Sequence, residues 1–246
     1  MNYSPILIVS GEPNSIFLEI FFKTLKKNKF KSPIIIISSK KLINLQMKQL
    51  NYKMNLKILN ASKLDNYNLD NKTINLLDVE YNPKKAFEKI SKKSNKFIES
   101  SFQLAFKIIK KYNIHKFING PISKKNFLNN NFLGITEYVS KKFNAKKTCM
   151  LIYNKDLSVC PITTHVPLKL VTKSITKKSI VEKVSLINSF YKNKFNLKPK
   201  IAILGLNPHC ESTHNYDEDK KIINPVIKNL IKNYNVSGPY PADTIF

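Results

Sequence analysis

The chain has 246 residues, and 42 Lys against 16 Asp and Glu give it a formal net charge of +26. This length is enough for one large domain or two small ones, and 42% hydrophobic residues with 15 Phe and 11 Tyr exclude a disordered chain. No apolar run approaches the roughly 20 residues of a membrane-spanning helix, so an integral membrane protein is also excluded.

Short apolar runs alternate with longer segments of helical periodicity, which is typical of an α/β protein. The expected strands, in chain order, are residues 6–9, 34–37, 56–59, 117–118, 150–153, 159–162 and 201–204. The expected helices are residues 16–25, 95–112, 137–143, 175–191 and 218–234. Residues 60–94 are the most polar part of the chain, and we expect them to form a surface excursion.

Every basic residue is Lys, and the lysines are spread along the chain in pairs such as Lys26-Lys27 and Lys177-Lys178. Proteins that read base sequence favour Arg, because its planar group makes two parallel hydrogen bonds. The even spread therefore indicates nucleotide bias in the genome. We expect no specific nucleic-acid partner, but attraction to polyanions or to a phosphorylated substrate fits this charge.

The cysteines indicate the redox environment in which the protein works. Cys149, Cys160 and Cys210 are an odd number without CxxC spacing, which is typical of free thiols in a reducing environment. The first residues have no basic segment and no small-residue cleavage site, so they do not resemble a secretory signal. We expect a cytoplasmic protein with no membrane partner.

Two of the four histidines follow predicted strands. His165 comes after residues 159–162, and His209 comes after residues 201–204. Two imidazoles at one edge of a sheet predict a divalent metal site, although ordinary hydrogen-bonded loops are an equal alternative. His115 and His214 have no such partner, and we expect both on the surface.

Two glycine segments are candidates for anion binding. Residues 134–137 lead into a predicted helix, whose free N–H groups and Thr136 hydroxyl suit an anion, although Thr136 is equally suited to cap that helix. Residues 120–124 place a Ser and a Lys after a strand, which fits either phosphate binding or a simple turn. The chain has no Rossmann glycine fingerprint, Walker A, HExxH or GxSxG motif.

Six segments in order, GEPNSI, GPISK, GITEY, TTHVPL, GLNPH and GPYPADTIF, resemble the 4-hydroxythreonine-4-phosphate dehydrogenase family of pyridoxal phosphate (vitamin B6) biosynthesis. The resemblance implies a two-domain α/β fold like that of the isocitrate and isopropylmalate dehydrogenases. Residues 1–246 would then be one α/β unit of two intertwined subdomains. It also implies a homodimer with the active site at the subunit interface.

The resemblance further implies oxidation of the C3 hydroxyl of 4-phosphooxy-L-threonine by NAD or NADP, followed by loss of CO2 to give an amino-ketone phosphate. His165 and His209 match two of the family's three ligands for a divalent metal, with Zn, Mg and Co as candidates. Thr136 matches a substrate-binding Thr. Asp243, in the PADT segment, is expected to contact the metal or the reacting hydroxyl as a catalytic residue.

Three departures from the family leave alternatives open. Ile135 stands where the family usually has His, and Cys210 begins a stretch that is usually small and rich in Gly. Family members also continue past Phe246, so the C-terminal part with the third metal His is expected to be missing. The alternatives are a dehydrogenase for another phosphorylated hydroxy acid, such as a phospho-threonate or phospho-erythronate, and a catalytically incomplete binding relative.

Overall fold

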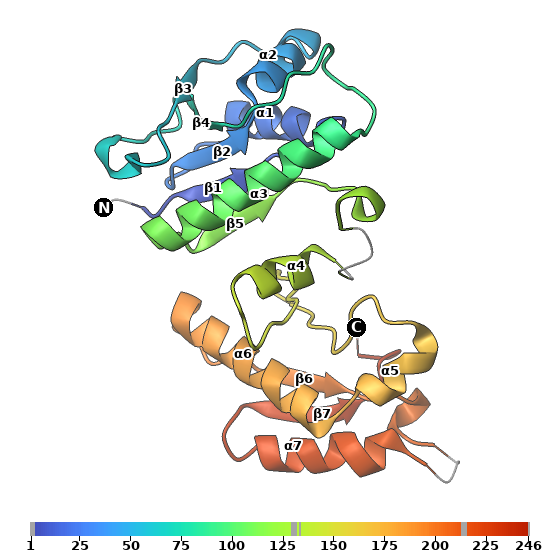
Figure 1. Cartoon of the computed structure of the whole chain (residues 1–246). Coiled ribbons are helices and arrows are strands. Elements are labelled where there is room, and N and C mark those ends of the chain that lie inside the picture. Colours follow the sequence, from blue (N-terminus) through green and yellow to red (C-terminus); the bar gives the residue numbers. More distant parts are fainter. Residues whose placement is uncertain (1–2, 129–131, 133, 213–215, 246) are drawn as a thin grey trace. The chain divides into compact units, whose positions relative to one another are not determined.

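The structure is a computed structural model and describes residues 3–128, 132, 134–212 and 216–245 (Figure 1). The chain divides into two compact units, Met1–Phe132 and Leu133–Phe246, here called unit 1 and unit 2. Both combine helices with a parallel sheet, as expected for the α/β class. Within the described residues, no helix has the length and apolar character needed to cross a membrane.

Unit 1 is built on a five-stranded parallel sheet in the order β3-β4-β2-β1-β5. Its strands are β1 Ile6–Val9, β2 Ile34–Ser38, β3 Leu56–Ile58, β4 Ile74–Asp78 and β5 Lys116–Asn119. β2 lies between β1 and β4 and is buried along its length, which explains its unbroken run of Ile. In register, Ile6 of β1 pairs with Ile34 of β2 on one side and with Lys116 of β5 on the other.

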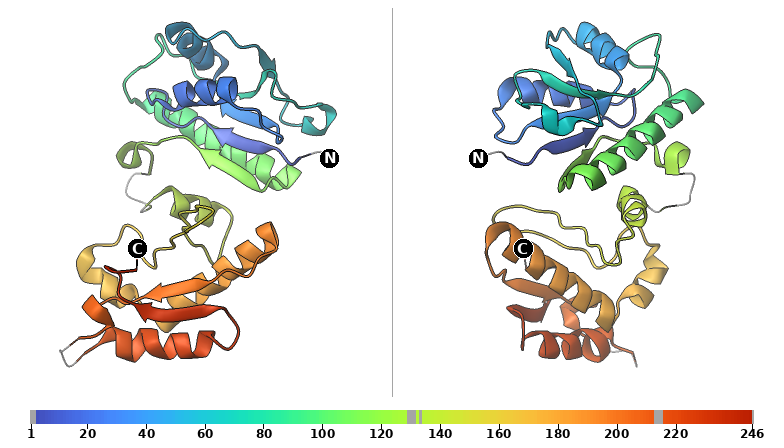
Figure 2. Two further views of the ribbon diagram at one scale, coloured as in Figure 1. Left: turned by 180° about the vertical axis from the view of Figure 1, so that it is seen from behind. Right: turned by 60° about the vertical axis from the view of Figure 1, so that its left-hand side comes forward.

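Helices cover both faces of this sheet. They are α1 Phe17–Lys27, α2 Lys40–Gln49 and α3 Lys92–Tyr112. α3 packs against β1 and β2, and α1 and α2 lie on the opposite face (Figures 1 and 2). Ser91 and Ser94 form a capping box at the start of α3, and the fully buried Phe102 is surrounded by other rings on the sheet side. A short 3-10 turn, Leu64–Asn66, and a π-helical turn, Lys124–Leu128, complete the unit.

Unit 2 contains a two-stranded parallel sheet of β6 Ile201–Leu204 and β7 Val236–Tyr240. Its helices are α4 Ile135–Lys142, α5 Leu168–Ser174, α6 Lys177–Phe195 and α7 Asn224–Leu230. Two short turns, Pro208–Cys210 and Asp219–Ile223, lie between β6 and α7. The core consists of apolar side chains from α6, α7 and the sheet, including Ile180, Val184, Ile227 and Val236.

The observed strands differ from the predicted ones in three parts of the chain. The expected strands 150–153 and 159–162 are reduced to one antiparallel bridge between Ile152 and Val159, because Pro161 has no N–H to continue the pairing. Residues 60–94 are not only a surface excursion, since they contain β4, with Ile74, Leu76 and Leu77 buried. β7 was also not expected from the sequence.

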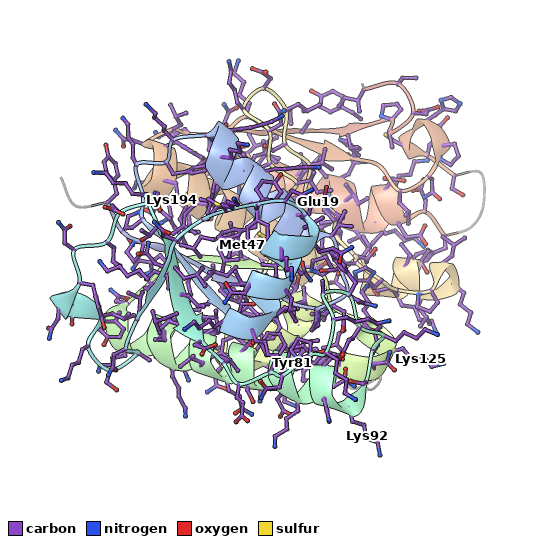
Figure 3. All side chains as sticks on the ribbon, turned by 90° about the horizontal axis from the view of Figure 1, so that it is seen from above. Glu19, Met47, Tyr81, Lys92, Lys125 and Lys194 are labelled. Atoms are coloured by element: carbon purple, nitrogen blue, oxygen red, sulfur yellow. The ribbon has the colours of Figure 1, made fainter. Side chains whose placement is uncertain are left out.

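Lysines cover the surface as their even spread along the chain predicted. Their side chains project outward in Figure 3, Lys92 and Lys125 among them, and both of these residues are exposed. Met47 and Tyr81, by contrast, are buried. The surface charge is therefore distributed over many elements.

Candidate functional site

In unit 1, the loops after β1 and β5 meet at the point where the strand order changes direction, which is where open α/β sheets usually bind ligands. A Cβ on Gly11 would lie 2.4 Å from the carbonyl oxygen of Pro121, and one on Gly120 would lie 2.1 Å from that of Ser10. Only glycine permits this approach. The Glu12 N–H also donates to the Pro121 carbonyl at 2.7 Å. The GEPNSI and GPISK segments thus pack directly against each other.

Glu12, in the loop after β1, was not predicted as a site residue. Its side chain is only 6% exposed, and burial raises the pKa of its carboxyl above the usual value, with a smaller opposing effect from the Ser94 hydroxyl. That hydroxyl already donates to the carbonyl of Ser91 at 2.9 Å. Within the described residues, neither carboxylate oxygen of Glu12 therefore has a well-formed hydrogen bond. Burial without a partner favours the neutral form of the acid.

In unit 2, the start of α4 brings together two predicted site residues. Thr136 is the second residue of α4, and Gly134 caps the helix. A Cβ on Gly134 would lie 3.6 Å from Nε2 of His165 and 3.0 Å from Oε2 of Glu137, so both side chains border the same space. In the part of the chain that the structure describes, this buried oxygen of Glu137 has no hydrogen-bond partner.

His165 does not follow a strand, because the expected strand 159–162 did not form. The residue is exposed in an irregular segment between the Ile152–Val159 bridge and α5. Its φ of 56° lies in the left-handed region, which few residues other than glycine adopt. The backbone conformation, rather than a sheet edge, turns the imidazole toward Gly134.

His209 lies in the loop after β6, as predicted, and a buried carboxylate holds this loop in place. Asp219 is 0% exposed. It accepts hydrogen bonds from the N–H of Leu206 at 3.0 Å, from the N–H of Asn207 at 2.9 Å and from the Asn207 side chain at 3.0 Å. His209 follows this anchored segment with φ at 55° and an exposed side chain. Asp219 therefore positions the loop that carries His209.

Asp243 lies in the turn after β7 and is exposed. Its charge acts on Cys210: burial raises the pKa of that thiol, and the negative charges of Asp219 and Asp243 raise it further. Cys210 in turn contacts Gly205, where an added Cβ would lie 2.7 Å from its sulfur. Asp243 is thus close to the base of the His209 loop.

The predicted site residues consequently form two groups in unit 2. Thr136, His165 and Glu137 gather at the start of α4, and His209 and Asp243 lie at the ends of β6 and β7. Among the residues that the structure describes, no cluster of three or more His, Cys, Asp and Glu has metal-binding geometry. A metal shared by His165 and His209 stays a prediction.

The remaining candidates are peripheral. His115 is exposed, as expected, and His214 lies outside the described residues. Ser123 directly precedes the π-helical turn, and its carbonyl accepts a hydrogen bond from the Phe127 N–H at 2.8 Å. Its hydroxyl accepts a second hydrogen bond from the Asn126 side chain at 2.9 Å. Both His115 and Ser123 belong to unit 1, whereas the residues gathered at the start of α4 belong to unit 2.

Sequence reasoning missed Glu12, Glu137 and Asp219. Asp219 belongs to an acidic run, Asp217 to Asp219, at the start of the helix expected over residues 218–234. Its burial and its bonds to the GLNPH segment depend on the tertiary structure. Glu137 stands in the GITEY segment, and its proximity to His165 was equally invisible in the sequence.

Comparison with known proteins places these segments in a family. Residues 29–246 match the family model described as pyridoxal phosphate biosynthetic protein PdxA. A 4-hydroxythreonine-4-phosphate dehydrogenase of Sulfurihydrogenibium sp. is 35% identical over 247 aligned residues, which cover 98% of this chain and 75% of that relative. One of Bacteroides thetaiotaomicron is 29% identical over 96% of this chain and 66% of its own length.

Solved structures agree on the fold. A crystal structure of 4-hydroxythreonine-4-phosphate dehydrogenase from Klebsiella pneumoniae has a TM-score of 0.82 at 21% identity, covering 99% of this chain and 77% of that one. One from Burkholderia phymatum has a TM-score of 0.79 at 21% identity, with 99% and 76% covered. With the match of the family model over residues 29–246, these findings show that the chain belongs to the PdxA family.

Proposed function

We propose that this chain oxidises 4-phosphooxy-L-threonine at its C3 hydroxyl and that the resulting β-keto acid loses CO2, which gives an amino-ketone phosphate for pyridoxal phosphate synthesis. Membership of the PdxA family is the observation that carries the proposal, and the relatives' name, 4-hydroxythreonine-4-phosphate dehydrogenase, supplies the substrate class. When bound, NAD or NADP would supply the hydride acceptor for this oxidation.

The start of α4 is the proposed binding site for the substrate. The first turn of a helix presents N–H groups without intrahelical partners, and they favour anions. Thr136 adds a hydroxyl in this turn, and His165 borders it beside Gly134. These groups suit a phosphorylated acid, and the net charge of +26 attracts it over longer distances.

The donors near α4 also fit a divalent metal. An imidazole nitrogen of His165 and a buried carboxylate oxygen of Glu137 without another partner are both suitable ligands. We propose His165 and His209 as metal ligands. When bound, a divalent metal supplies Lewis acidity that polarises a carbonyl oxygen.

Asp243 is the proposed catalytic carboxylate. Being exposed beside the His209 loop, it can accept a hydrogen bond from the reacting hydroxyl and hold the proton that leaves with oxidation. Asp219 keeps the backbone of that loop in place and does not itself face the substrate, since it is fully buried.

A direct assay tests the proposal. The full chain, supplied with Zn²⁺, Mg²⁺ or Co²⁺, is incubated with 4-phosphooxy-L-threonine and NAD or NADP, and formation of the reduced cofactor is followed by absorbance. We expect turnover that His165→Asn abolishes and that the matched control His115→Asn, on an exposed residue outside the site, leaves intact. Metal and substrate binding without turnover would instead support a catalytically incomplete relative.

Ile135 favours a second candidate substrate. It is the first residue of α4, where the family usually has His, so one polar contact to the substrate is lost. A dehydrogenase for a phospho-threonate or phospho-erythronate is therefore the alternative. Assaying these acids side by side with the wild-type chain and Ile135→His separates the two: the substitution should raise kcat/KM for 4-phosphooxy-L-threonine only if that compound is the native substrate.

We also propose that the protein works as a homodimer in the cytoplasm, with its active site at the subunit interface. Large apolar side chains are exposed in unit 2, including Leu168 at 87%, Ile152 at 61% and Leu197 at 58%. A dimer interface would bury side chains of this kind where they adjoin one another. Light scattering should give twice the mass of 28.4 kDa.

A further inference from the structure

Two of the three cysteines belong to one hairpin in unit 2. Ile152 and Val159 exchange both backbone hydrogen bonds, at 2.8 and 3.0 Å, and form the antiparallel bridge of this hairpin. Its turn is closed by Ser158, whose hydroxyl donates to the Asn154 carbonyl at 2.9 Å. The hairpin is therefore defined by several bonds at its tip.

The register of this bridge places the two thiols on the same face. If the register of the Ile152–Val159 bridge is continued outward, residue 160 falls opposite residue 151, and residue 149 is the next residue on the same side as 151. Cys149 and Cys160 are thus diagonal neighbours. Cys149 is near enough to Cys160 to raise the pKa of its thiol. Both residues are partly exposed and both are unpaired.

A lysine holds the cysteine strand in place from α6. The Nζ of Lys183 donates to the carbonyl of Thr148, the residue before Cys149, and its charge also acts on Cys160. The positions of the two thiols are consequently fixed from both ends of the hairpin. The charge of Lys183 partly opposes the effect of burial on Cys160, whose thiolate is the reactive species.

We propose that Cys149 and Cys160 are a reversible dithiol–disulfide pair, oxidised by low-molecular-weight disulfides such as oxidised glutathione. This goes beyond the proposed dehydrogenase function and does not depend on it. Intracellular disulfides of this kind are usually transient and redox-sensing.

The reaction proceeds in two exchanges. The Cys149 thiolate attacks one sulfur of the oxidant, which forms a mixed disulfide and releases one low-molecular-weight thiolate. Cys160 then loses its proton and attacks the Cys149 sulfur, which forms the protein disulfide and releases the second thiolate. Two protein thiols are oxidised, and one disulfide is reduced to two thiols.

The two thiols have different roles in this scheme. Burial, with a smaller effect of Cys149, raises the pKa of Cys160 to about 11 against the opposing charge of Lys183. Cys160 is therefore the slower, resolving thiol, and Cys149 is the attacking one. Because the thiolate fraction grows about tenfold per pH unit below the pKa, resolution should be about tenfold faster at pH 8 than at pH 7.

Oxidation would act on a cavity and on the segment that leads to His165. Cys160 lines a largely apolar cavity of about 680 Å³ in unit 2, together with Lys183, Tyr191 and Ile203. Pro161 follows it directly, and His165 is five residues further along the chain. A disulfide would join the wall of this cavity to residue 149 and limit the movement of the segment that carries the predicted metal ligand.

The test uses the full chain and needs no catalytic activity. The reduced protein is equilibrated with reduced and oxidised glutathione in varied ratios, quenched with acid, alkylated and digested with trypsin. Cleavage after Lys147, Lys155 and Lys169 separates residues 148–155 from residues 156–169, so a disulfide leaves these two peptides joined. We expect this joined product, with Cys210 alkylated throughout.

Matched variants decide the outcome. Cys149→Ser and Cys160→Ser should each abolish the joined peptide, and Cys149→Ser should also abolish the mixed disulfide, whereas Cys210→Ala should retain the joined product. Circular dichroism confirms that each variant is folded. A glutathione adduct on Cys149 that never resolves, at pH 7 or at pH 8, would overturn the proposal, as would a disulfide that includes Cys210.

Discussion

Replacing Asp219 with Ala tests whether a buried carboxylate holds the His209 loop. The substitution removes the acceptor of three hydrogen bonds, from two backbone N–H groups and one side-chain amide, at 2.9 to 3.0 Å. A hydrogen bond to a charged group contributes about 1.5–3 kcal/mol net. Because Leu206 and Asn207 are only half-buried, water replaces part of this loss. We expect the free energy of unfolding of unit 2 to fall by about 3–4 kcal/mol.

Hydrogen exchange gives the local readout, because the two backbone donors are themselves exchanging amides. Their exchange should become at least about 100-fold faster, which corresponds to a loss of about 3 kcal/mol. Urea unfolding is followed by circular dichroism, since the chain has no Trp. Asp219→Asn keeps one acceptor oxygen and should lose less. Asp156→Ala, on an exposed turn, is the matched control and should change the stability by under about 0.5 kcal/mol. Unchanged exchange at Leu206 and Asn207 in Asp219→Ala would refute the reasoning.

Three further substitutions test the packing and electrostatics of unit 1. Because burial raises the pKa of Glu12, its contribution to stability is fully present below the unfolded-state pKa and is lost as the pH rises through the folded-state pKa. Glu12→Gln should flatten this decline in urea unfolding as the pH rises above about 4, the usual pKa of Glu, and an equal decline in both proteins would contradict it. Phe102→Ala should cost about 3–5 kcal/mol in the same assay, since Phe102 is 0% exposed among other rings, whereas Ile20→Ala, at a site 50% exposed, should cost under about 1 kcal/mol. Gly120→Ala should prevent stable folding of unit 1, because the new Cβ would lie 2.1 Å from the backbone oxygen of Ser10. At Gly134 the nearest atom is a side-chain atom, Oε2 of Glu137 at 3.0 Å, so Ala should be tolerated there. Similar thermal stability of the two variants would argue against the backbone contact.

Sequence patterns predicted the strands that are purely apolar. β1 and β6 have the expected bounds, and β2 differs by one residue. β4 was missed because a polar residue interrupts it: Asn75 is 1% exposed, and its side-chain amide donates to the carbonyls of Ile34 and Asp70 at 3.0 and 2.6 Å. A buried Asn that links two strands is indistinguishable in the sequence from an Asn in a loop.

The candidate site was predicted only in part, for a similar reason. Motifs located Thr136, His165, His209 and Asp243, but the expectation that both histidines follow strands was correct only for His209. The residues that position or border them, Asp219 and Glu137, act through contacts with other segments. Spacing along the chain does not encode those contacts.

The left-handed backbone at His165 and His209 determines how their side chains should be deleted. Both have φ near 55°, where a residue with a Cβ is strained and where Asn is among the best tolerated after Gly. Substitution of either histidine by Ala would therefore combine loss of the imidazole with a backbone penalty of about 1 kcal/mol. The backbone of the surrounding turn would then change its conformation. Asn at either position removes the imidazole and keeps the turn, so the usual default of alanine is the wrong reference at these two residues.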